Sequence, residues 1–148
     1  MTKPSSVPSK PYADDATNSI YELLFCDDIN FYKPDASALL AYPWNILFDP
    51  EPEQVDLEKI VFDDQMESRI KLLAYDAMRR HGFPVEEKEL LGVIVEVGLD
   101  EGLDILASYQ DGTARYINYT GKMILWDAPD KVSAEITAQI FRDSLNIV

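Results

Sequence analysis

The stretch Leu91-Gly92-Val93-Ile94-Val95-Glu96-Val97-Gly98-Leu99 decides the fold, because an apolar residue stands at every odd position. Residues 103–109, 114–119 and 123–126 form three further runs of strand-forming side chains. Alternation with a period of two is typical of a strand that buries one face. Turn residues separate the runs at 100–102, 111–112 and 120–121. The sequence therefore predicts a four-stranded antiparallel meander sheet over about residues 90–127.

The lengths of the three turns predict how the strands pair. We expect a three-residue loop at 100–102, ending in glycine, and two-residue turns at 111–112 and 120–121. The resulting pairs are Val97 with Ile105, Val95 with Ala107, Tyr109 with Ala114, and Tyr116 with Leu125. This register places one apolar set on the core face: Val93, Val95, Val97, Ile105, Ala107, Tyr109, Tyr116, Met123 and Leu125. A slip of one residue would turn a whole strand over.

The same register predicts a second face with an apolar and aromatic centre surrounded by charged residues. Its candidate binding residues are Ile94, Arg115, Ile117, Tyr119, Ile124 and Trp126. Arg115 is expected directly opposite Trp126, which suits a cation–π contact. We favour the interpretation that the aromatic-rich segment 29–48 or the first helix covers this face. An exposed patch would instead indicate contact with a partner, a ligand or a second copy.

Helical periodicity on both sides of the strands completes the predicted α+β class. We expect helices over about residues 16–26, 53–61 and 64–81, and a C-terminal helix after Asp127-Ala128-Pro129-Asp130. The helix over 64–81 and the C-terminal helix are expected to cover one face of the sheet. Residues 1–15 hold three prolines and few apolar side chains, which predicts a disordered tail. Residues 16–148 then form a single domain.

Charge excludes some classes of partner. The 148 residues carry 27 acidic and 13 basic side chains, a formal net charge of −14. Such a surface repels phosphate backbones and anionic membranes, so we expect neither nucleic-acid nor membrane binding. A basic protein partner is permitted, although solubility alone also explains the charge. No signal peptide or membrane-spanning run is recognisable, so we expect a cytoplasmic protein.

The sequence carries no recognisable catalytic, metal or cofactor signature. Cys26, the single cysteine, stands in an apolar run, which predicts a buried thiol. His81, the single histidine, is expected at the end of a helix, and a zinc site would have to rely on carboxylates. No glycine-rich loop precedes a helix as a phosphate site requires. A pair of carboxylates acting as a hydrolase stays open, because such residues need meet only in space.

Two functions therefore remain. The first is a non-enzymatic protein-binding or regulatory module of acidic character, such as an inhibitor or immunity-type protein, acting on a partner or forming a homodimer. The second is a small-molecule-binding domain or small enzyme with a pocket between the second face and segment 29–48. Asp104, Arg115, Tyr119 and Trp126 would line that pocket. A closed cavity against Arg115 and Trp126 would favour the second function, and a flat exposed patch the first.

Overall fold

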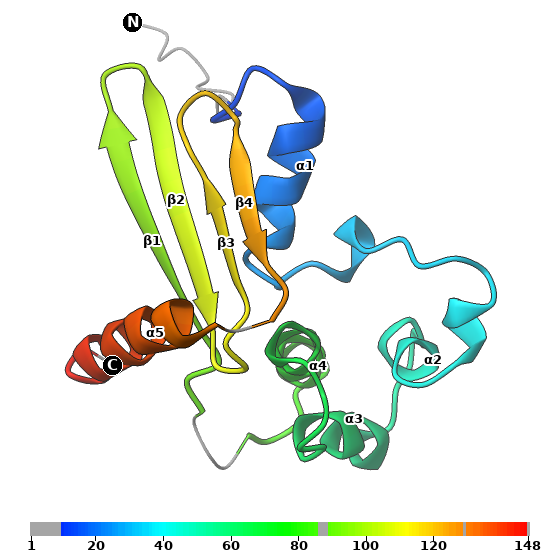
Figure 1. The fold of residues 1–148 in the computed structure, drawn as a ribbon. Coiled ribbons are helices and arrows are strands. Elements are labelled where there is room, and N and C mark those ends of the chain that lie inside the picture. The colour runs from blue at the N-terminus through cyan, green and yellow to red at the C-terminus, as the bar shows by residue number, and fades with distance from the viewer. Residues whose placement is uncertain (1–9, 86–88, 129, 148) are drawn as a thin grey trace, which may run out of the picture.

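The computed structural model describes residues 10–85, 89–128 and 130–147. Its strands β1 (Gly92–Leu99), β2 (Gly102–Tyr109), β3 (Ala114–Ile117) and β4 (Met123–Trp126) form one antiparallel sheet in the order β1-β2-β3-β4. Figure 1 shows this sheet beside a group of helices, with the C-terminal helix crossing one end of it. The α+β class and the four-stranded meander are confirmed.

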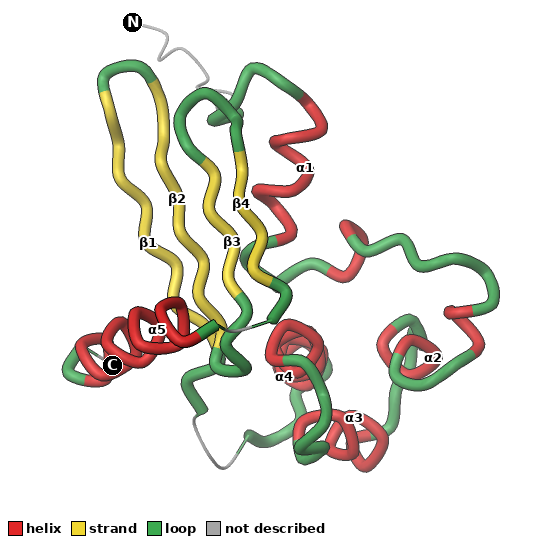
Figure 2. The backbone as a smooth tube through the Cα atoms, in the orientation of Figure 1, coloured by secondary structure: helices red, strands yellow, loops and turns green. Residues whose placement is uncertain are grey.

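The helices fall into three groups along the chain. α1 (Asp15–Leu23) comes first, and the short elements η1 (Ile29–Phe31), η2 (Ala38–Leu40) and α2 (Trp44–Leu47) follow. α3 (Gln54–Val61) and α4 (Ser68–Arg80) precede the sheet, and α5 (Lys131–Leu145) follows it. Figure 2 shows that long loops separate the short elements, as the prolines of this segment require.

Two helices begin where a side chain can satisfy their first N–H groups. Asp14 caps α1 and accepts a hydrogen bond from the Thr17 N–H at 2.8 Å, so this helix begins close to the predicted residue 16. Asp130 caps α5 and accepts a hydrogen bond from the Ser133 N–H at 2.7 Å. Pro129, also expected at this start, lies outside the described residues.

α4 begins at Ser68 rather than at the predicted residue 64. The Ser68 N–H donates to Asp111 Oδ2 at 2.9 Å, and the Asp111 N–H donates to Ser68 Oγ at 3.0 Å. A residue of the β2–β3 turn therefore caps this helix, and no local capping box could reveal it. The helix ends as predicted, with Gly82 in the left-handed region at φ +73°.

The disordered tail was predicted to reach residue 15, and this boundary is wrong. Tyr12 is buried, and its hydroxyl donates to the Leu103 carbonyl at 3.1 Å. Its backbone N–H donates to the Asn18 side chain at 3.0 Å. Tyr12 therefore packs onto the sheet and Asp15 already belongs to α1, while residues 1–9 lie outside the described residues.

Each of the three turns differs from its predicted length by one residue. β1 and β2 are joined by two residues, because Gly102 pairs with Leu99 and belongs to β2. The other two turns are three-residue loops: the Tyr109 N–H donates to the Thr113 carbonyl, and the Asn118 N–H donates to the Lys122 carbonyl. Gly112 and Gly121 end these loops with φ near +90°, the geometry that had been assigned to Gly102.

The new register turns β1 and β3 over while β2 and β4 stay as predicted. Val95 pairs with Leu106 and Tyr116 pairs with Ile124, so all four share the face opposite the core. Val93 and Val97 lie on that face too, so the predicted core placement of Val93, Val95, Val97 and Tyr116 is wrong. Ile117, predicted for the second face, pairs with Ile105 and is fully buried.

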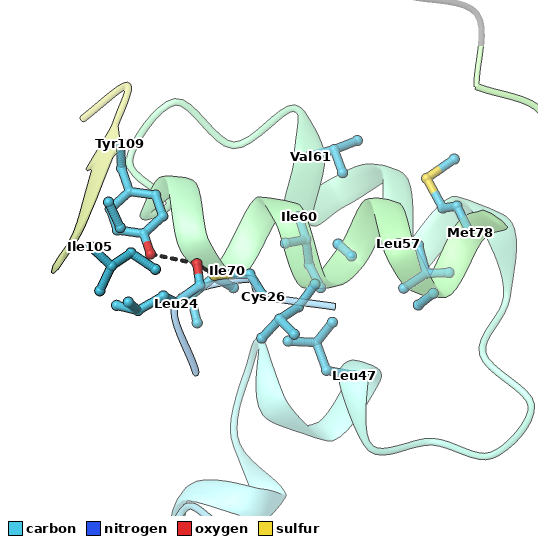
Figure 3. Packing of buried hydrophobic residues seen from close by; sticks show 14 of the residues in the cluster. Leu24, Cys26, Leu47, Leu57, Ile60, Val61, Ile70, Met78, Ile105 and Tyr109 are labelled. Carbon is cyan, nitrogen blue, oxygen red and sulfur yellow. Dashed lines mark hydrogen bonds between the residues drawn. The ribbon is translucent and has the colours of Figure 1, made fainter. Parts of the chain in front are cut away.

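The core lies between the inner face of the sheet and the helices. Figure 3 shows Ile105 and Tyr109 of β2 close to Leu24, with Ile60, Ile70 and other helix residues beyond them. The Tyr109 hydroxyl donates to the Leu24 carbonyl at 2.6 Å, which ties the sheet to the end of α1. Leu47 of α2 also joins this core, so the aromatic-rich segment packs against helices instead of the sheet.

Helices cover both faces of the sheet rather than one. On the core face, the Tyr21 hydroxyl of α1 donates to Glu96 Oε1 at 2.7 Å. On the opposite face, Ser133 and Thr137 of α5 line a small cavity with Ser108 and Ala114. The first helix thus covers the core face, and α5 covers only one end of the other.

Candidate binding surface

The six residues predicted to bind do not form one surface. Ile94, Arg115 and Ile117 lie on the core face, because they pair with the inward-facing residues Ala107 and Ile105 of β2. Ile124 and Trp126 lie on the opposite face, and Tyr119 stands in the turn after β3. Ile117 is buried, Ile94 is partly buried against the core, and Tyr119 and Ile124 are exposed.

Arg115 is held by hydrogen bonds and an ion pair at the end of the sheet. Its guanidinium donates to the carbonyls of Ala114 at 2.9 Å and Trp126 at 3.2 Å, and it lies 2.8 Å from Asp127. Only 13% of the side chain is exposed. The predicted cation–π contact with the Trp126 ring is wrong, because Arg115 pairs with Leu125 and points to the other face.

The predicted single pocket against Arg115 and Trp126 does not form. Arg115 lines a polar cleft of about 420 Å³ together with Arg69, Asp111 and Asp127. Trp126 lines a separate cavity of about 130 Å³ beneath α5. Residues of segment 29–48 line neither of them.

The most exposed apolar area of the sheet lies on the face opposite the core, between α5 and the tip of the β1–β2 hairpin. Val95, Val97, Leu99 and Ile124 are 43%, 49%, 44% and 51% exposed. Leu106 and Tyr116 complete the row between Val95 and Ile124 and are partly buried. We call these six residues the open face. Figure 1 shows α5 crossing one end of the sheet only, and within the described residues no other helix lies over this face.

Three acidic residues lie at the end of the open face nearest the β1–β2 tip. Asp104 pairs with Val97, and its carboxylate accepts hydrogen bonds from the Tyr116 hydroxyl at 3.0 Å and the Tyr119 N–H at 2.8 Å. The bond to Asp104 raises the pKa of Tyr116 above its ordinary value, so the phenol stays protonated. Asp100 and Glu101 are exposed at the tip of the β1–β2 hairpin. The surface is therefore apolar at its centre and charged at this end, where Lys122 follows Asp104 in the same cross-strand row.

α5 carries further exposed apolar residues, and part of it lies beyond the sheet. Its first two turns supply the residues that line the cavity with β2, β3 and β4. Figure 1 shows the rest of the helix running out past β1, with the C-terminal end outside the sheet. Leu145 in that part and Ile147 just after it are exposed, as are Val132 and Ile136 nearer the start.

A groove lies away from the sheet faces, between α4 and the residues on either side of it. Its volume is about 780 Å³, and apolar residues such as Phe25, Leu72, Phe83 and Leu91 line it. The charged residue Asp76 lines it as well, and its two carboxylate oxygens pair with Arg79 at 2.7 Å and Arg80 at 2.9 Å. Sequence reasoning missed this groove, because its walls come from three separate segments.

The two rare reactive residues occupy ordinary structural places. Cys26 is buried as predicted, with the Tyr32 hydroxyl 3.4 Å from its sulfur. His81 follows α4 directly, as predicted, and stacks on Phe83 at 5.9 Å between ring centroids. Among the described residues, no three His, Cys, Asp or Glu side chains gather as a metal site would need. None of the described helices has the length and apolar character to cross a bilayer.

Comparison with known proteins gives no further guide. The chain matches no protein-family model, no curated protein and no solved structure.

Proposed function

We propose that this chain is an acidic protein-binding module that docks another polypeptide on the open face. The observation that carries the proposal is the exposure of Val95, Val97, Leu99 and Ile124 on one sheet face. Each square ångström of apolar surface removed from water contributes about 25 cal/mol. Contiguous apolar patches with a polar margin usually mark sites of protein contact.

The shape of the open face favours a polypeptide over a small ligand. Small molecules bind in concave cavities that enclose most of their surface, whereas the open face is one side of a sheet. The acidic residues Asp100, Glu101 and Asp104 at its margin oppose nucleic acid for electrostatic reasons. A partner can instead lay apolar side chains across several strands at once.

A second candidate function rests on the groove lined by Phe25, Leu72, Phe83 and Leu91. Its volume of about 780 Å³ suits a drug-sized molecule, and its lining is mostly apolar. A small apolar ligand bound there would leave the open face without a role. Leu72→Arg would abolish such binding, whereas substitutions on the open face would not alter it.

The experiment that tests the proposal compares two lysine substitutions. Val97→Lys places a charge on the open face, and Val55→Lys places one on α3, where Val55 is similarly exposed at 53%. Tagged wild type and both variants are used to capture proteins from extracts of the cells that make the chain. We expect Val97→Lys to lose at least one bound polypeptide that the Val55→Lys control keeps. Identical sets of bound proteins would contradict the proposal.

A further inference from the structure

β1 is an edge of the sheet, and no described segment pairs with its outer side. It has eight residues and pairs without a bulge along its whole length with β2. It contains neither proline nor lysine, and its only charged residue, Glu96, is bound to Tyr21 on the core face. Natural proteins usually protect such edges with charges, prolines, bulges or short strands. The other edge, β4, has only four residues.

The outward backbone groups of β1 can be identified from one hydrogen bond. The Gln110 N–H donates to the Leu91 carbonyl at 2.9 Å, so residue 91 directs its backbone groups toward β2. Because this direction alternates along a strand, residues 93, 95, 97 and 99 also point inward. The N–H and C=O groups of Gly92, Ile94, Glu96 and Gly98 therefore point away from the sheet.

The sequence of this edge reads almost the same in both directions. From Leu91 to Leu99 it is Leu-Gly-Val-Ile-Val-Glu-Val-Gly-Leu, and only Ile94 and Glu96 break the symmetry about Val95. An antiparallel pair of identical strands centred on Val95 would place each residue opposite its mirror position. Such a strand is complementary to itself.

We propose that the partner of this module is a second copy of the chain, which pairs antiparallel along β1 about a two-fold axis at Val95. This inference rests on the proposed function and names its partner. Gly92 lies opposite Gly98 of the second copy, and Ile94 lies opposite Glu96 of the second copy. Both are pairs of outward-pointing residues, which can exchange two hydrogen bonds each. The two sheets become one continuous eight-stranded sheet.

The charges of the edge select this register. Centred on Val95, the pairing sets each Glu96 against an isoleucine, while a register centred on Glu96 would set two carboxylates directly opposite each other. On the open face, Val95 meets Val95 of the second copy, and Val93 meets Val97 of the second copy. Cross-strand pairs of β-branched side chains stabilise a sheet. The open faces of the two copies therefore join into one apolar surface.

The overhang of α5 supplies the rest of the interface. A paired strip of seven residues is about 23 Å long and roughly 10 Å thick, or about 230 Å². A stable interface buries roughly 800 Å² on each partner, so strand pairing alone is too small. The two-fold axis keeps both open faces on one side. The end of α5, with Leu145 and Ile147, then passes over the open face of the second copy near its Val97.

The two copies of α5 fit this arrangement without collision. α5 covers the row of Val93, which lies two residues, or about 7 Å, from the axis at Val95. The two-fold rotation doubles this offset to about 14 Å. Directly packed helices lie about 8–10 Å apart, so each α5 lies clear of its copy.

Charge reversal at the axis tests the proposal. Sedimentation equilibrium of the wild type is expected to show a dimer that tightens with added salt, because two copies of charge −14 repel each other. Val95→Lys and Val95→Glu each set like charges opposite one another and weaken self-association by about tenfold or more. Their equimolar mixture restores the dimer. Val55→Lys, on α3, is the control that leaves it unchanged.

The outcomes separate this inference from the proposed function. A wild type that stays monomeric at millimolar concentration overturns the self-pairing, and the capture experiment with Val97→Lys then decides whether another partner uses the open face. A dimer that survives both substitutions at Val95, or whose mixture fails to re-form, overturns the register. Gly98→Pro gives an independent check. It removes one outward N–H, and a Cβ at this position meets no neighbour within 4 Å, so the fold is retained while the dimer is lost.

Discussion

Replacing Tyr109 by phenylalanine removes one buried hydrogen bond and leaves the aromatic ring in place. The Tyr109 side chain is 1% exposed, and its hydroxyl lies 2.6 Å from the Leu24 carbonyl. The ring also lies 5.8 Å from the guanidinium of Arg69, a contact that phenylalanine keeps. The substitution therefore leaves packing and the cation–π contact nearly unchanged and tests the hydrogen bond alone.

The expected loss of stability follows from what remains at the Leu24 carbonyl. A buried acceptor that loses its partner costs about 1–3 kcal/mol. The Cys26 thiol lies 3.6 Å from this carbonyl and is a weak donor that compensates in part. We therefore expect Tyr109→Phe to lower the free energy of unfolding by about 1–2 kcal/mol. For a chain of this size that corresponds to a fall in Tm of roughly 2–8 °C.

Urea unfolding followed by circular dichroism measures this loss. With a slope of about 2 kcal/mol per molar urea, the midpoint should fall by about 0.5–1 M while the slope stays the same. Tyr119→Phe is the matched control, since Tyr119 is exposed and its substitution should change the midpoint by less than about 0.2 M. A Tyr109→Phe midpoint equal to that of the control would refute the reasoning.

Two further predictions concern pH. Burial raises the pKa of the Asp111 carboxyl, but hydrogen bonds from Thr113 and Ser68 outweigh it and hold the pKa below its ordinary value. The stability advantage of wild type over Asp111→Asn should thus be complete above about pH 4 and shrink as the pH falls further, which urea midpoints at pH 7 and 3 would show. Burial and the nearby charges of Asp104 and Glu96 raise the pKa of Tyr12 to about 12. Wild type should therefore lose more stability than Tyr12→Phe between pH 10 and 12, and equal losses would contradict this assignment.

The predicted meander is correct because the alternation in residues 91–109 and the turn glycines are local signals. The register is wrong because a glycine can serve a turn in two ways. Gly102 has a φ of +153°, unlike the values near +90° of Gly112 and Gly121, and a Cβ there would lie 3.2 Å from Cβ of Tyr119. Its positive φ and the close approach of a neighbouring turn, which only the folded chain creates, together explain this glycine. From the sequence, Gly102 was instead interpreted as the last residue of a three-residue loop.

The error in register moved the candidate site to other residues. Val93, Val95 and Val97 were expected in the core because valines at alternate positions usually face inward. The alternation of side chains does not reveal which face of a strand the helices will cover when both faces are apolar. In β1 both faces carry apolar side chains. Trp126 and Ile124 were correctly placed together, while Arg115 and Ile117 were placed with them only through the slipped pairing.

The covering elements depend on contacts that are distant along the chain. The segment 29–48 was expected to cover the sheet because it is rich in aromatic residues. Its side chains find partners nearer in sequence instead: Tyr32 lies 6.0 Å from Trp44, and Trp44 lies 6.0 Å from Phe48, between ring centroids. The segment therefore packs on itself and against helices, with Leu40 still 85% exposed, and it gives the open face no cover.

The reciprocal hydrogen bonds between Ser68 and Asp111 join two parts of the chain that are 43 positions apart. Local opening of the β2–β3 hairpin therefore frees the first turn of α4, and fraying of α4 frees the hairpin. The helical half and the sheet should exchange their amide protons with solvent as one cooperative unit at this junction. Evolutionary insertions would be tolerated at the β1–β2 tip, where no such bond exists among the described residues, and would be damaging at the β2–β3 tip.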